Sequence, residues 1–165
     1  MNWLVLFERV YGVLLLLTLL QALPNARRFF LSERWKGYAQ SSPEVDLIQN
    51  PVIMPVVLLA WFSCAALFIF SHQIFWAALI NLIFCRTFFI EMRWKGILRG
   101  MGAPGFMTYW MDLAVFLLES VSRFAPNLQS LTLLTLQIDF AGIMICSGVY
   151  KTLAGYRHNE GMEYG

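Results

Sequence analysis

The chain has 165 residues, of which 59% are apolar and 13% are charged. Soluble domains usually contain about 45–50% apolar and about 25% charged residues, so this composition predicts a membrane protein and excludes a disordered chain. The 12 Lys and Arg residues are nearly balanced by 10 Asp and Glu residues, giving a net charge of +2. This balance excludes a basic nucleic-acid-binding module, and we expect no nucleic acid partner.

The side chains that usually bind metals are few and scattered. Cys64, Cys85 and Cys146 all lie inside apolar runs, where a thiol packs as a small hydrophobic group. His72 lies in a predicted turn and His158 in the C-terminal tail, so the spans contain no pair of histidines that could ligate a haem. We therefore predict no metal site.

Five segments approach the length of about 20 apolar residues that a membrane-spanning helix needs. The first run carries no basic start and no small-residue cleavage pattern, so it is expected to be a retained span and not a signal peptide. We predict a single all-α integral membrane domain over residues 1–165, with five transmembrane helices. The predicted spans are residues 3–23, 51–70, 73–90, 106–121 and 131–153.

The basic residues outside the spans fall mainly on one side of this arrangement. Because basic loops are retained in the cytoplasm, the pattern predicts an external N-terminus and a cytoplasmic C-terminus. Only Arg123 lies on the opposite side. The residues on the predicted cytoplasmic side are Arg27, Arg28, Arg34, Lys36, Arg93, Lys95, Arg99, Lys151 and Arg157.

An internal repeat lies at an offset of 59 residues. Residues 27–37 and 86–96 are identical at seven of eleven positions, and each copy ends in Arg-Trp-Lys-Gly. Aromatic rings and long basic side chains gather at the headgroup level of a bilayer. The candidate lipid-headgroup residues are Arg34, Trp35 and Lys36 in the first copy and Arg93, Trp94 and Lys95 in the second.

Three interpretations of this repeat stay open. Cytoplasmic helix ends converge on aromatic and basic residues without common descent. Alternatively, a two-helix unit has been duplicated, as in other membrane folds. The third interpretation is a dedicated site for an anionic lipid or a phosphorylated ligand.

Ionisable residues inside spans should face protein or water and have a partner, because a charge in the hydrocarbon region is costly. From their distances to the span ends, we predict two intramembrane charge pairs: Arg86 with Asp112 near the inner side, and Arg9 with Glu119 near the outer side. Glu8 and Arg123 are alternative partners at the outer side. Such pairs would specify which helices touch.

Asp139 lies in the first half of the last span without a cation at its level. It is open to three roles: a structural hydrogen bond, proton or substrate handling, or a contact with a partner subunit. Asp139 and Lys151 are also the candidate catalytic residues, if the protein is an enzyme. The two residues are twelve positions apart on one helix, so their side chains do not point in the same direction. A cavity lined by both is possible but is not favoured.

The C-terminal region resembles the HTTM membrane domain of vitamin K-dependent gamma-carboxylase-like proteins. The resemblance covers about 30 residues, and its parts are residues 136–143 (LQIDFAGI), 147–153 (SGVYKTL) and 161–165 (GMEYG). It implies that Lys151 occupies the family's lysine position, and that the chain is a fragment or a reduced relative of such an enzyme. The later helices and the soluble domain of the carboxylases have no counterpart here.

Two functions follow as hypotheses. The first is a non-catalytic subunit of a larger membrane complex that contacts lipid, quinone or pigment through its many Phe, Trp and Met side chains. The second is a lobe of a carboxylase-like membrane enzyme acting on a lipid-soluble substrate. We favour the subunit, in a bacterial plasma membrane or an internal energy-transducing membrane, because the buried charges do not converge on a reactive set. No cofactor is evident from the sequence. A quinone or pigment at an interface is the option that the subunit hypothesis leaves open.

Overall fold

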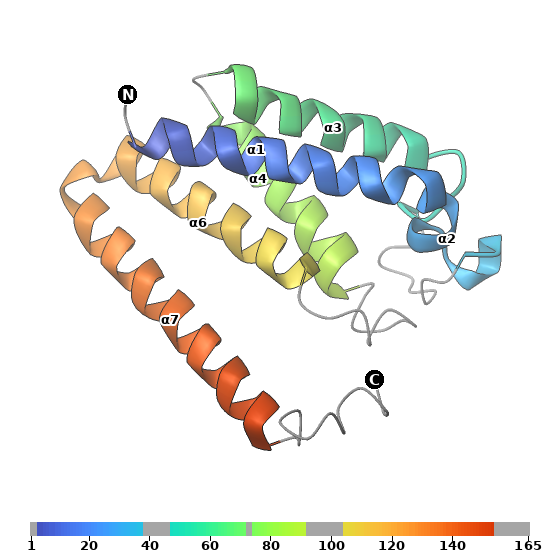
Figure 1. Ribbon diagram of the computed structural model, residues 1–165. Coiled ribbons are helices and arrows are strands. Elements are labelled where there is room, and N and C mark those ends of the chain that lie inside the picture. The colour runs from blue at the N-terminus through green and yellow to red at the C-terminus, as the bar shows by residue number, and fades with distance from the viewer. Residues whose placement is uncertain (1–2, 38–46, 72–73, 92–103, 154–165) are drawn as a thin grey trace. The chain divides into compact units, whose positions relative to one another are not determined.

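The computed structural model describes residues 3–37, 47–71, 74–91 and 104–153. Over these residues the chain is all-α, with five helices of eleven residues or more (Figure 1). The chain divides into two compact units, Met1–Glu119 and Ser120–Gly165, here called the N-terminal unit and the C-terminal unit.

Each of the five predicted segments overlaps one of the five helices, which confirms the all-α prediction. The third segment is divided, because its α-helix ends at Cys85 and a π-helical segment follows. The long helices are α1 (Trp3–Ala22), α3 (Met54–Phe70), α4 (Phe75–Cys85), α6 (Pro104–Phe124) and α7 (Gln129–Leu153). The short elements are η1 (Leu23–Asn25), α2 (Ala26–Phe30), η2 (Glu33–Trp35), the π-helical η3 (Arg86–Glu91) and η5 (Pro126–Leu128).

Two of the described helical stretches are both long and apolar enough to cross a membrane, Trp3–Arg28 and Pro126–Val149. The apolar helices Met54–Phe70 and Phe75–Phe88 are shorter. A 17-residue helix rises about 26 Å, which is at the lower limit for crossing about 30 Å of hydrocarbon. Length and composition are therefore weak support for a membrane protein.

In the N-terminal unit, α1 lies along α3 because Gly12 permits a close approach. A Cβ atom at Gly12 would lie 2.7 Å from Cβ of Phe68 and 3.1 Å from the carbonyl oxygen of Ala65. Tyr11, beside this glycine, packs edge-on against the Phe68 ring with centroids 5.3 Å apart. The small residue thus brings the two helix axes together, as is common in membrane helix pairs.

An aromatic cluster joins α2, α3 and the π-helical segment. Trp61 is fully buried, and its ring stacks on Phe88 with centroids 5.2 Å apart. Phe30 packs edge-on against Phe88 at 5.0 Å. Offset and edge-to-face ring packing adds to the free energy of burial, so this cluster anchors α2 and η3 to the end of the bundle.

The outer faces of the helices in this unit are apolar. On α1 the exposed side chains include Leu6, Val13 and Leu17, each about half exposed, opposite a buried stripe that contains Leu15 and Leu19. The exposed side chains of α3 and α4 include Val56, Leu59, Phe70, Trp76 and Ile83. A helix that is apolar around its whole circumference is typical of a membrane span or of a core helix.

The C-terminal unit contains the end of α6, a short connection and α7. Among its described residues α7 is the only complete long helix. Leu131, Ile138 and Ile145 are each at least 60% exposed. One helix cannot bury apolar side chains on all its sides, so the C-terminal unit by itself leaves apolar side chains of α7 uncovered.

We expect Gly12→Val to lower the free energy of unfolding by about 1–3 kcal/mol, because the added atoms overpack the contact with α3. The measurement is thermal or denaturant unfolding of the purified full chain in detergent. Gly148→Val in α7 is the matched control, since no described atom lies within 4 Å of a Cβ built there. Equal stability of the two variants would show that the α1–α3 contact is not close.

Candidate functional site

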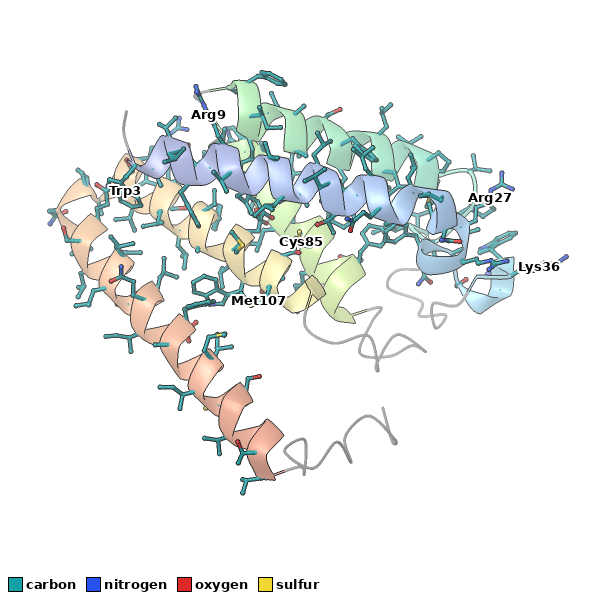
Figure 2. The ribbon with its side chains drawn as sticks, in the orientation of Figure 1. Trp3, Arg9, Arg27, Lys36, Cys85 and Met107 are labelled. Carbon is teal, nitrogen blue, oxygen red and sulfur yellow. The ribbon has the colours of Figure 1, made fainter. Side chains whose placement is uncertain are left out.

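A cluster of buried polar side chains lies in the middle of the N-terminal unit. We call it the polar cluster and define it as Tyr11 of α1, Trp61 of α3, Asn81 and Cys85 of α4, and Asp112 of α6. All five are buried, and each is at most 1% exposed. Figure 2 shows Cys85 inside this unit.

Asn81 is the centre of the polar cluster. Its amide nitrogen donates hydrogen bonds to the Tyr11 hydroxyl at 2.9 Å and to Oδ1 of Asp112 at 2.7 Å. Its amide oxygen accepts a hydrogen bond from the indole N–H of Trp61. The Cys85 thiol also lies 3.7 Å from this oxygen, one helical turn along α4. Both protons and both acceptor positions of the amide are therefore used.

These bonds connect four helices through one side chain. The Tyr11 hydroxyl extends the network by donating to the backbone oxygen of Thr108 in α6 at 3.3 Å. It also lies 3.9 Å from Sγ of Cys85. Because buried polar groups are costly unless they are hydrogen-bonded, this arrangement strongly favours one rotation of each helix about its axis.

Asp112 is fully buried, and only one of its oxygens is bonded. Oδ1 accepts from Asn81, whereas Oδ2 has no hydrogen-bond partner among the described residues. The structure thus gives Asp112 a different partner from the predicted one. Arg86 lies exposed at the first residue of η3, and its pairing with Asp112 stays a prediction. The sequence position of a residue gives its depth along a helix, but it does not specify the direction in which its side chain points.

One turn before Tyr11 on α1, Glu8 is buried and interacts with Glu119 of α6. Arg9 acts electrostatically on Glu8. Among the described residues Glu119 interacts with Glu8, and the pairing of Arg9 with Glu119 stays a prediction. The structure instead brings two carboxyl groups together, with the arginine beside one of them.

The first Arg-Trp-Lys-Gly copy forms a tight turn after α2. The backbone N–H groups of Trp35 and Gly37 both donate to the Ser32 carbonyl, at 2.8 and 3.0 Å. Lys36 has a positive φ of 62°, and a Cβ at Gly37 would collide with the Leu31 carbonyl. A glycine is therefore required at the last position of the motif.

The predicted headgroup residues of this copy are all exposed. The Arg34 guanidinium lies over the Trp35 ring at 5.5 Å, and Lys36 follows in the same turn. In the second copy Arg93, Trp94 and Lys95 lie outside the described residues. The starts of the two copies do meet, through the contact of Phe30 with Phe88.

The two candidate catalytic residues both lie on α7, in the C-terminal unit. Asp139 is exposed in the middle of this helix, and Lys151 is in its last turn. The polar cluster and these two residues belong to different units. Among the residues that the structure describes, no three His, Cys, Asp or Glu side chains are grouped as a metal site requires.

Asn81, Tyr11 and Trp61 were not predicted as site residues. Asn81 is an uncharged amide inside an apolar run, and a search restricted to ionisable groups passes over it. An amide in a membrane helix is itself a signal, because it must find hydrogen-bond partners on neighbouring helices. Tyr11 and Trp61 carry no such signal, since both residue types are common in apolar segments.

Comparison of the chain with protein-family models, curated protein sequences and solved structures finds no match. The resemblance to the HTTM domain therefore stays a prediction. The polar cluster contains no pairing of a nucleophile with a base. Its chemistry is that of a structural hydrogen-bond network.

We expect Asn81→Leu to lower the free energy of unfolding by about 2–4 kcal/mol. The substitution removes the hydrogen bonds of the amide to the buried side chains of Trp61, Tyr11 and Asp112, and a buried polar group that loses a partner costs about 1–3 kcal/mol. The measurement is unfolding of the purified chain in detergent, followed by circular dichroism.

Asp112→Asn is the conservative control, because an amide oxygen can still accept from Asn81. It should change stability by less than about 1 kcal/mol. The double variant Asn81→Leu/Asp112→Leu should be less destabilised than the sum of the two single Leu variants, since both partners of one bond are removed together. Strict additivity would mean that the two side chains are not coupled.

Proposed function

We propose that this protein is a non-catalytic integral membrane subunit of a larger membrane complex. In this proposal the five long helices cross the bilayer, with the N-terminus outside and the C-terminus in the cytoplasm. The observation that carries it is the inverted distribution of polarity in the N-terminal unit. Polar side chains meet at its centre, and the outer faces of its helices are apolar.

The distribution of basic residues supports the orientation. Arg27 and Lys36 lie beyond one end of α1, and Arg9 lies towards the opposite end (Figure 2). The cytoplasmic side of a membrane protein is enriched in Lys and Arg. The shorter helices are compatible with this arrangement, because α4 and η3 together form a helical stretch over 75–91 and because a bilayer thins locally around short spans.

The apolar side chains of α7 that its own unit leaves uncovered support the role of a subunit. Its exposed apolar side chains would contact either lipid or the helices of a partner. Small residues along the same helix, including Gly142 and Gly148, would permit a close approach of a partner helix. Lipid, quinone or pigment would fill the remaining interface.

The topology can be tested by cysteine accessibility. Asn25 and Asn127 are exposed and lie at opposite ends of the proposed spans. We expect Asn127→Cys to react with a membrane-impermeant maleimide on intact cells, and Asn25→Cys to react only after permeabilisation. The unmodified chain is the control for Cys64, Cys85 and Cys146. Labelling of both positions from the same side would contradict an odd number of crossings between them.

The subunit role can be tested by site-specific photocrosslinking in native membranes. A photoreactive residue at Ile145 of α7 should give one discrete protein adduct of higher mass. The same residue at Val13, on the exposed face of α1, should react mainly with lipid. If Ile145 gives only lipid adducts and the chain migrates as a monomer, the subunit proposal fails. A bound quinone-like substrate in that monomer would favour the enzyme alternative.

A further inference from the structure

A groove lies in the N-terminal unit where α1 ends and α3 begins. Its volume is about 560 Å³, and η1 and the start of α2 form one side of it. The opposite side is apolar and comes from the first three turns of α3, including Leu58, Leu59 and Phe62. Arg27 and Arg28 belong to the same lining, so the groove combines an apolar wall with two consecutive arginine residues.

The two arginines are available to a ligand. Both are exposed, and no carboxylate among the described residues pairs with either of them. Arg34, on the following turn, differs because it lies over the Trp35 ring at 5.5 Å. Arginine is suited to phosphate because its planar guanidinium donates two parallel hydrogen bonds.

We propose that this groove binds one phospholipid with an anionic headgroup, taken from the cytoplasmic leaflet. The headgroup phosphate is held by Arg27 and Arg28, and an acyl chain lies against Leu59 and Phe62. The proposal rests on the membrane orientation proposed above, which puts this end of α1 at the cytoplasmic headgroup level. It concerns a different place from the exposed Arg34-Trp35-Lys36 turn, whose residues do not line the groove.

Two features of the groove favour a lipid over a soluble phosphate compound. Leu59 is 68% exposed, and α3 also exposes Val56 near the same end. A soluble anion would leave these side chains uncovered, whereas an acyl chain buries them. Anionic lipids are also concentrated in the cytoplasmic leaflet, where basic residues near the membrane attract them.

The test is a lipid titration of the purified full chain in detergent, followed by native mass spectrometry. The probes are phosphatidylglycerol and phosphatidylcholine with identical acyl chains. We expect one tightly bound phosphatidylglycerol and weaker binding of phosphatidylcholine. The double variant Arg27→Gln/Arg28→Gln should bind phosphatidylglycerol about 30-fold more weakly, from the usual contribution of a basic residue near a membrane surface.

Two further variants separate charge from shape. Arg34→Gln removes an exposed arginine outside the groove and should change the affinity less than about threefold. Leu59→Trp narrows the groove while both lining arginines remain, and should also weaken binding. Circular dichroism of each variant checks that its helices are retained, since all these positions are exposed.

The proposal is overturned if the double variant binds phosphatidylglycerol as tightly as the unmodified chain, or if phosphatidylcholine binds equally well. Displacement of the lipid by millimolar inorganic phosphate would also overturn it, because the site would then recognise the phosphate alone. The titration uses the isolated chain, so its result does not depend on a partner subunit. If crosslinking finds no partner, the subunit role is refuted and the lipid result stands. If the chain binds no lipid in the groove, the lipid proposal is refuted and the crosslinking result stands.

Discussion

The arrangement of the N-terminal unit depends on the side-chain amide of Asn81. Apolar helix faces pack in several rotations and registers with similar free energies, especially where lipid covers their outer sides. An amide with two donors and two acceptors is selective, because each bond that is lost leaves a buried polar atom without a partner. Asn81 satisfies this requirement with groups from α1, α3 and α6 together with its own helix, so the four helices are aligned by the same contact.

The remaining contacts of this unit extend that alignment outwards from the polar cluster. Directly beside the cluster, the Gly12 contact brings α1 against α3, and Tyr11 next to it reaches the amide. Towards the end of the unit that contains α2, Trp61 packs into the aromatic cluster with Phe30 and Phe88. This cluster in turn positions α2, whose arginines border the groove. The hydrogen-bond network of the polar cluster is thus connected by direct packing to α2 and its two arginines.

The prediction of charge partners shows where reasoning from the sequence reaches its limit. Asp112 was expected to be buried against another helix, and it is. The expected partner was a cation at the same depth, yet the observed partner is an amide. Similarly, Glu119 was expected to meet Arg9 but lies by Glu8, the adjacent residue on α1. Neighbouring residues on a helix differ by about 100° in direction, so an error of one residue is enough to replace a cation by a carboxylate.

Properties that depend on a short stretch of chain could be obtained from the sequence by itself. These are the five helices, their apolar faces, the basic character of one end and the repeated Arg-Trp-Lys-Gly motif, because each follows from local composition and spacing. The polar cluster, the contact between the two repeat copies and the groove beside Arg27 arose from the packing of helices far apart in the chain. An apolar run does not encode its rotation about its own axis, and that rotation depends on all neighbouring helices at once.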